Sequence, residues 1–197
     1  MSQIYSDVDL LLLNRWQHVM SLLQAHRDIQ PKIEQVIELT EARLKPWADA
    51  HGFEVEAHAR EGKFDFWKTS WADKRREPKV RFEIGGFCPT GFRKSTELHP
   101  YLWVFTQLDK YRIKEPERVA FARNVRTKLG DAAQQWAHHD ADDTWSPFGM
   151  YLTHYDDGAR AQLVSSTDAL YAFCTEHLPA LVTFVEPIDA ELRQFGL

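Results

Sequence analysis

Two segments near the start of the chain place apolar residues three or four positions apart, which is the spacing of an amphipathic helix. The stripe in residues 7–28 contains Leu13, Trp16, Met20 and Leu23. A second stripe, in residues 31–51, begins at Pro31, a residue suited to the first turn of a helix. We therefore expect two helices that meet near Pro31 and form an antiparallel hairpin, with both stripes buried.

After Gly52 the pattern changes to strict alternation, the period of a strand with one buried and one exposed face. Alternating runs lie at 53–58, 63–68 and 79–84, and a run at 101–106 is apolar on both faces. Consecutive strands of this kind are typical of an antiparallel meander.

The last third predicts helices around one further hairpin. A helical stripe spans about 116–138, and Ser166 or Thr167 can cap a helix that ends before Pro179. Between them, residues 150–155 and 161–165 flank an Asp-Gly turn and predict two strands.

These elements predict a single α+β domain spanning all 197 residues. Residues 1–51 would form the helical hairpin and residues 52–114 the antiparallel meander. Residues 115–197 would supply a helix, the second hairpin and the C-terminal helices. The sheet would be mostly antiparallel, with about five or six strands.

Composition is that of a cytoplasmic globular protein. Cys88 and Cys174 lie far apart and outside any metal-ligand spacing, so we expect reduced thiols. No stretch approaches the roughly 18 apolar residues of a membrane span, and the start of the chain lacks the basic segment of a signal peptide. We expect no cofactor, and no metal requirement for folding.

The formal net charge of −5 is distributed unevenly. Residues 60–128 contain seventeen Lys and Arg against nine Asp and Glu, whereas residues 129–197 contain two against eleven. Phosphate contacts need clustered Lys and Arg, and nearby aromatic rings such as Trp67 and Trp71 can stack on bases. The predicted nucleic-acid or anion site consists of Lys74, Arg75, Arg76, Lys79, Arg81, Arg118, Arg123 and Arg126.

The same asymmetry leaves other arrangements open. The basic segment can dock against the acidic third of its own chain, or against that of a second copy in a homodimer. The acidic third can also mimic nucleic-acid phosphates in an inhibitor. The residues that suggest such mimicry are Asp140, Asp142, Asp143, Asp156 and Asp157.

Carboxylates gather on the exposed face predicted for the early strands. They are Glu54, Glu56, Asp65 and Glu83, with Lys63, Lys68, Lys79 and Arg81 among them. Carboxylates on one sheet face can hold Mg²⁺, and a nearby lysine can position a water molecule for phosphodiester cleavage. Alternation also produces a ladder of opposite charges in any half-exposed sheet, and we favour that interpretation.

Two further motifs contain residues that can carry chemistry. The run from His138 to Asp143 resembles the His-Asp pair of HD-type metal phosphohydrolases, but that family is all-helical and uses further ligands. The loop from Gly85 to Gly91 has neither a dinucleotide-binding nor a P-loop spacing, and Cys88 has no evident catalytic partner. We interpret both as loop structure, without metal ligands or catalytic residues.

Phe64-Asp65-Phe66-Trp67-Lys68 and Lys79-Val80-Arg81-Phe82-Glu83-Ile84-Gly85 resemble part of a known superfamily. With the helical segment before them, they are similar to the C-terminal portion of bacterial and phage proteins grouped with the PD-(D/E)XK nucleases. The resemblance covers a third to a half of the chain. The catalytic pattern, Asp followed one strand later by Asp/Glu-x-Lys, is not met because glycine occupies position 85. The resemblance implies an accessory or degenerate module.

Without a complete catalytic motif, the sequence favours binding over catalysis. We predict a non-catalytic module for nucleic acid or a protein partner in a bacterial or phage defence or mobile-element context, and no membrane partner. The alternatives are a Mg²⁺-dependent phosphodiesterase or nuclease that uses the sheet-face carboxylates, and an inhibitor that acts by acidic mimicry.

Overall fold

A five-stranded sheet with strand order β1-β2-β3-β4-β5, antiparallel throughout, lies at the centre of the computed structural model. The structure describes residues 6–87, 99–136 and 145–196. The strands are β1 (Phe53–His58), β2 (Lys63–Lys68), β3 (Val80–Gly85), β4 (Tyr101–Thr106) and β5 (Phe148–Tyr151). The predicted α+β class and antiparallel sheet are confirmed.

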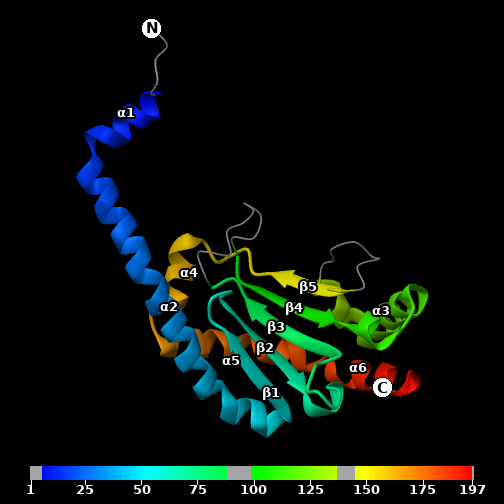
Figure 1. The fold of residues 1–197 in the computed structure, drawn as a ribbon. Helices are drawn as coiled ribbons and strands as arrows, with labels where there is room; N and C mark the ends of the chain where they lie inside the picture. The colour runs from blue at the N-terminus through cyan, green and yellow to red at the C-terminus, as the bar shows by residue number, and fades with distance from the viewer. Residues whose placement is uncertain (1–5, 88–98, 137–144, 197) are drawn as a thin grey trace.

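Helices precede the sheet, connect its last two strands and follow it. They are α1 (Asp7–Asn14), α2 (Trp16–His51), α3 (Glu115–Leu129), α4 (Asp157–Leu163), α5 (Thr167–Val182) and α6 (Val185–Gln194). Short 3-10 turns are η1 (Thr69–Trp71), η3 (Leu108–Tyr111) and η4 (Gly130–Gln135). Figure 1 shows α5 and α6 behind the sheet and α2 along its β1 edge. Helix α3 packs against α6.

The core lies between one face of the sheet and α2, α5 and α6. Alternate strand residues point into it because successive side chains of a strand face opposite ways. The buried strand residues include Phe64, Phe66, Phe82, Ile84, Leu102 and Val104. Ile37 and Leu44 of α2 and Leu181 and Ile188 of the C-terminal helices are fully buried against them.

The predicted N-terminal hairpin is instead one long helix after a short one. Helix α2 continues through Pro31 and Pro46, so the predicted helix boundary at Pro31 is wrong. A proline inside a helix cannot donate to the carbonyl four residues earlier. Burial of Ile33, Ile37 and Leu44 in the following turns offsets this loss. The helix ends, as predicted, at Gly52, which has a φ of 72°.

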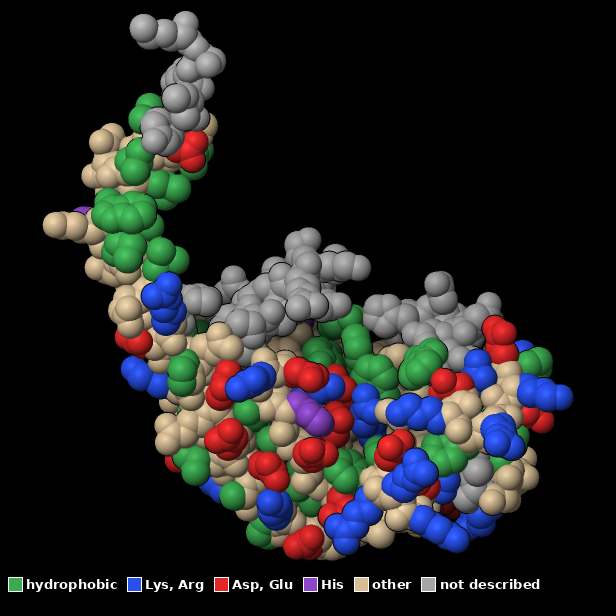
Figure 2. All heavy atoms as spheres, viewed as in Figure 1, with side chains coloured by type: hydrophobic (Ala, Val, Ile, Leu, Met, Phe, Trp, Pro, Cys, Tyr) green, Lys and Arg blue, Asp and Glu red, His purple; other side chains and the backbone are tan. Residues whose placement is uncertain are grey.

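Residues 6–30, which we call the arm, project away from the body of the molecule (Figures 1 and 2). The large apolar side chains of the arm, which include the predicted stripe of Leu13, Trp16, Met20 and Leu23, are exposed by 42% to 70%. They are Val8, Leu10, Leu11, Leu12, Leu13, Trp16, Met20, Leu22, Leu23 and Ile29. The predicted burial of this stripe is wrong, because no other described helix lies against it. None of the described helices is both long and apolar enough to cross a membrane.

The second predicted hairpin also differs from what the structure shows. Strand β5 ends at Tyr151, and residues 157–163 form α4 instead of a strand. The Asp156 carboxylate accepts a hydrogen bond of 2.8 Å from the backbone N–H of Ala159, which caps this helix. Helix α5 runs through Pro179 to Val182, beyond its predicted end.

Candidate functional site

The face of the sheet opposite the core carries charged and aromatic side chains, and no described helix crosses in front of it (Figure 1). At its centre, Asp65 on β2 and Glu83 on β3 are direct cross-strand neighbours. Only 5% and 3% of these residues' surfaces are exposed. Like charges placed opposite each other repel, so this pair requires cations beside it.

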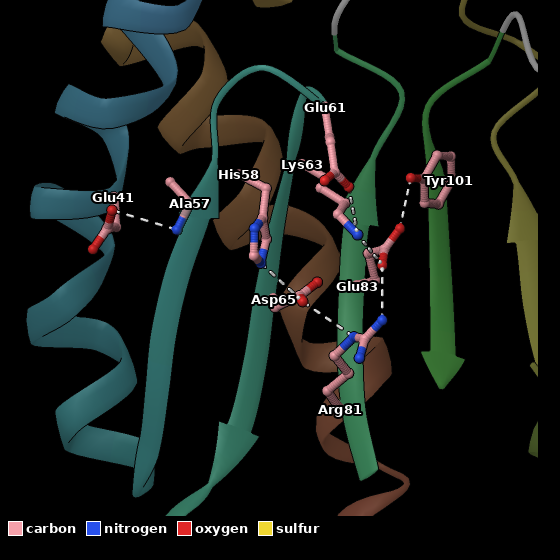
Figure 3. Close-up of polar contacts among 9 residues, drawn as sticks. All are labelled: Glu41, Ala57, His58, Glu61, Lys63, Asp65, Arg81, Glu83 and Tyr101. Atoms are coloured by element: carbon pink, nitrogen blue, oxygen red, sulfur yellow. Dashed lines mark hydrogen bonds and ion pairs between the residues drawn. The ribbon is translucent and has the colours of Figure 1, made fainter. Parts of the chain in front are cut away.

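Asp65 is held by an arginine and a histidine (Figure 3). Arg81 Nε and His58 Nε2 each lie 3.1 Å from its Oδ2 atom. Arg81 Nη2 also lies 4.0 Å from Glu83 Oε2, so that one guanidinium links both acids. The hydrogen bond to Asp65 raises the pKa of His58, although burial opposes the shift. Asp65 Oδ1 has no hydrogen-bond partner among the described residues.

Glu83 is held by a lysine and a tyrosine. Lys63 Nζ lies 2.9 Å from Glu83 Oε2, and the Tyr101 hydroxyl donates a hydrogen bond of 2.7 Å to Oε1. Burial raises the pKa of Glu83, and Lys63 opposes that shift. Burial alone would lower the pKa of the Lys63 amine, but Glu83 and Asp65 outweigh it and raise that pKa. The lysine therefore remains charged.

This geometry is that of an ion-pair network. A divalent ion at the two acids would have to displace Lys63 and Arg81, which already occupy the facing oxygens. Within the part of the chain that the structure describes, no three His, Cys, Asp or Glu side chains converge to hold a metal. Glu54 and Glu56 lie exposed on β1, the edge strand, and do not join the pair.

Replacing His58 by glutamine is expected to destabilise the protein more at low pH than at high pH. The pKa of His58 is raised in the folded protein, so its contribution is complete below the usual value of about 6.5 and is lost as pH rises through the folded value. We expect a loss of up to about 1 kcal/mol near pH 5.5 and a smaller loss near pH 8.5. Urea denaturation at each pH measures these losses. The control is His154→Gln, at a histidine that is exposed. A loss that grows with pH would contradict the pair with Asp65.

The basic residues predicted as an anion site do not form one group. Lys74, Arg75 and Arg76 lie exposed in the loop between η1 and β3, and Arg123 lies exposed on α3. Lys79 is buried beneath this loop, with its amine 5.7 Å from the centre of the Tyr111 ring.

The other predicted arginines have partners inside the fold. Arg81 belongs to the sheet-face network. Arg118 Nη1 donates a hydrogen bond of 2.8 Å to the carbonyl of Ile113, and the Arg126 guanidinium lies 5.0 Å from the centre of the Phe148 ring. These contacts hold α3 and the segment before it in place.

A cationic surface nevertheless exists where the loop of residues 73–79 meets η3. The Tyr111 hydroxyl donates a hydrogen bond of 3.0 Å to the carbonyl of Glu77, and Lys110 Nζ lies 3.9 Å from the Glu77 carboxylate. Figure 2 shows Lys and Arg side chains gathered over this part of the molecule and over α3. We call the exposed cations here the basic end: Lys74, Arg75, Arg76, Lys110, Arg112 and Lys114.

Two arginines of the basic end have a left-handed backbone. Arg76 has a φ of 65° and Arg112 a φ of 63°, and they are the only non-glycine residues with positive φ among those described. The Asp73 carboxylate fixes the first loop by accepting hydrogen bonds from the N–H groups of Arg75, at 2.7 Å, and Glu77, at 3.0 Å.

The aromatic residues expected to stack on bases lie inside the fold. Trp71 is only 1% exposed, and its indole N–H donates a hydrogen bond of 2.6 Å to Asp189 of α6. Trp67 is half-buried near the end of β2. The prediction that Trp71 offers a stacking surface is therefore wrong.

Several acidic residues of the last third serve the fold. Lys128 pairs with the buried Glu191, Asp168 pairs with Arg43, and Asp189 accepts from Trp71. Such partners account for part of the negative charge without an external ligand. The segment from His138 to Asp143 and the glycine loop from Cys88 onward lie outside the described residues. Burial raises the pKa of the Cys174 thiol far above its usual value, so this thiol is inert.

Sequence reasoning missed His58 and Tyr101 as partners of the sheet-face acids. They join the network because strand register places them beside Asp65 and Glu83. The positive φ of Arg112, which lies in the basic segment, is a backbone angle that no sequence pattern marks. Comparison with family models, with curated proteins and with solved structures finds no match for this chain.

Proposed function

We propose that this protein is a non-catalytic module that binds nucleic acid through the basic end. The observation that carries the proposal is the pair Arg76 and Arg112, each left-handed and exposed, on neighbouring loops. A left-handed backbone costs an arginine roughly 1–2 kcal/mol that a glycine would avoid. Strain of this kind is concentrated at functional sites.

The chemistry of these side chains fits phosphate. A guanidinium is always charged and offers paired donors that match two phosphate oxygens. In the described residues, Arg75, Arg76 and Arg112 form no ion pair. Lys74, Lys110 and Lys114 add charge around them, so a phosphate backbone can be contacted at several points.

Reversing charge in the loop is expected to weaken binding to duplex DNA and to reduce its salt dependence. Each phosphate contact contributes about −0.9 to the slope of log K against log salt, so Arg75→Glu with Arg76→Glu should flatten it by about 2. Fluorescence anisotropy at several salt concentrations measures the slope.

The control is Lys32→Glu with Lys45→Glu, two exposed lysines of α2 whose reversal changes net charge equally. This variant should retain most of the affinity and the slope. Equal losses in both variants would mean that only net charge matters. An unchanged slope in the loop variant would refute the site.

A glycine at position 76 tests the strain argument within the same experiment. Arg76→Gly should raise the free energy of unfolding by about 1 kcal/mol while it weakens DNA binding. Arg75→Gly removes the same charge at a residue without positive φ, so it should weaken binding with no gain in stability. If both variants gain stability, or if neither does, the backbone angle of Arg76 is not the cause of any gain. Backbone strain would then no longer support the proposed site.

A further inference from the structure

Lys79 is the one buried charged residue of the described structure that has no ion pair. Charged side chains are rarely buried in a protein unless an opposite charge lies beside them. The buried charged residues among those described are Asp65, Lys79, Glu83 and Glu191. Asp65 and Glu83 belong to the sheet-face network, and Glu191 pairs with Lys128. Lys79 is 8% exposed, and within the described residues its amine contacts only an aromatic ring.

The backbone of Lys79 is fixed between three segments. Its N–H donates a hydrogen bond of 2.8 Å to the carbonyl of Trp71, at the end of η1. Its carbonyl accepts a hydrogen bond of 2.8 Å from the N–H of Gln107, directly after β4. The amine lies over the ring of Tyr111, in η3. The ammonium group is therefore held where the loop of residues 73–79 meets η3, at the basic end.

The groups around this ammonium group do not neutralise it. The centre of the Tyr111 ring is 5.7 Å away, close to the limit of about 6 Å at which a ring attracts a cation. The Glu77 carboxylate pairs with a different lysine, at 3.9 Å. The Asp73 carboxylate accepts hydrogen bonds from two backbone N–H groups. The hydrogen bond from Glu77 is the largest cause of the lowered pKa of Asp73, and the charge of Lys79 is the smallest.

We infer that Lys79 is the inner ligand of a phosphate site, and that one phosphate group binds between the loop of residues 73–79 and η3. The inference rests on the proposed function and names the contact that the ligand makes deepest in the protein. Arg76 lies three residues before Lys79, and Arg112 directly follows Tyr111, so both left-handed arginines belong to the segments that flank the site. A phosphate bound there accepts from the ammonium group and supplies the opposite charge that a buried cation requires.

Inorganic phosphate tests the site without nucleic acid. Titrated against chloride at constant ionic strength, it should raise the thermal unfolding midpoint of the full chain, because a ligand that binds only the folded state stabilises it. Lys79→Met keeps the aliphatic stem and removes the charge, so it should abolish this rise without lowering the midpoint in chloride. Lys74→Met is the matched control, since it removes the same charge from an exposed lysine of the same loop and should keep the rise.

A wild-type midpoint that does not respond to phosphate would overturn the inference, as would a full response in Lys79→Met. Equal losses in Lys79→Met and Lys74→Met would also overturn it, because the response would then depend only on net charge. A Lys79→Met chain that does not fold would have the same meaning. The ammonium group would then serve the fold and have its partner inside the protein.

Duplex DNA separates this inference from the proposed function. Lys79→Met should weaken binding roughly tenfold and reduce the salt slope by about 0.9, the loss of one phosphate contact. If Arg75→Glu with Arg76→Glu weakens DNA binding but Lys79→Met binds as the wild type does, the proposed function stands and the inner site is wrong. If Lys79→Met loses the phosphate response while neither variant changes DNA binding, the site takes a small phosphate compound and the proposed function is wrong.

Discussion

Replacing Arg81 by methionine should lower the free energy of unfolding by about 3 kcal/mol. Removal of one partner from a buried ion pair costs about 3–5 kcal/mol, because it leaves an uncompensated charge in a medium that solvates it poorly. Here the substitution leaves Asp65 with His58 alone, and Glu83 loses its more distant cation. Since His58 partly compensates, we expect the lower end of that range. Urea denaturation at neutral pH measures the loss.

Arg43→Met provides the control for this prediction. Arg43 pairs with Asp168 on the surface, where the two side chains are 42% and 87% exposed. An exposed pair contributes up to about 1 kcal/mol, so this variant should lose much less stability. The variant Asp65→Leu with Arg81→Met removes acid and base together and should lose less than Arg81→Met alone. Similar losses from Arg81→Met and Arg43→Met would show that the sheet face is solvated.

The sheet could be predicted because one physical rule determines it. Phe64, Phe66, Phe82 and Ile84 alternate with charged residues, and only a strand with one buried face satisfies that pattern. Side-chain pairing across strands could not be predicted in the same way. Asp65 meets Glu83 because of the register between β2 and β3, and the turn and loop that join strands determine register.

The errors in predicting the N-terminal helices have a common cause. Periodicity shows that a helix has an apolar face, but not what covers that face. The stripe through Trp16 and Leu23 therefore predicts a hairpin within the chain, although no second helix lies beside it among the described residues. Pro31 reinforced the error, since the local preference for a helix start was overridden by packing of the turns that follow it.

The prediction of the second hairpin is wrong for a local reason. An Asp-Gly pair between apolar runs is a strong turn signal, but the same residues can begin a helix when an acid precedes them. Asp156 does so here by capping α4. The candidate site was likewise predictable only in part. The exposed loop arginines follow from composition, whereas the inward positions of Lys79, Arg81 and Trp71 depend on the folded sheet.

Phe184→Ala should be at least as damaging as Arg81→Met, with an expected loss of about 3–5 kcal/mol. Phe184 is fully buried where α5 ends and α6 begins. Its ring centre lies 4.8 Å from that of Trp136 and 4.9 Å from that of Phe148. An alanine there leaves a cavity between the sheet and both C-terminal helices, and these aromatic neighbours cannot collapse into it without leaving their own sites.

Phe195→Ala is the matched comparison, because Phe195 is only partly buried at the end of α6. The truncation removes the contact with Phe121, whose ring centre is 6.4 Å away. The space that it leaves is open to solvent. We expect this variant to lose about 1–2 kcal/mol. Thermal and urea unfolding of both variants measure the difference. Because Phe184 connects the helices to β5, comparable losses would show that α6 does not dock on the sheet as a single packed layer with α5.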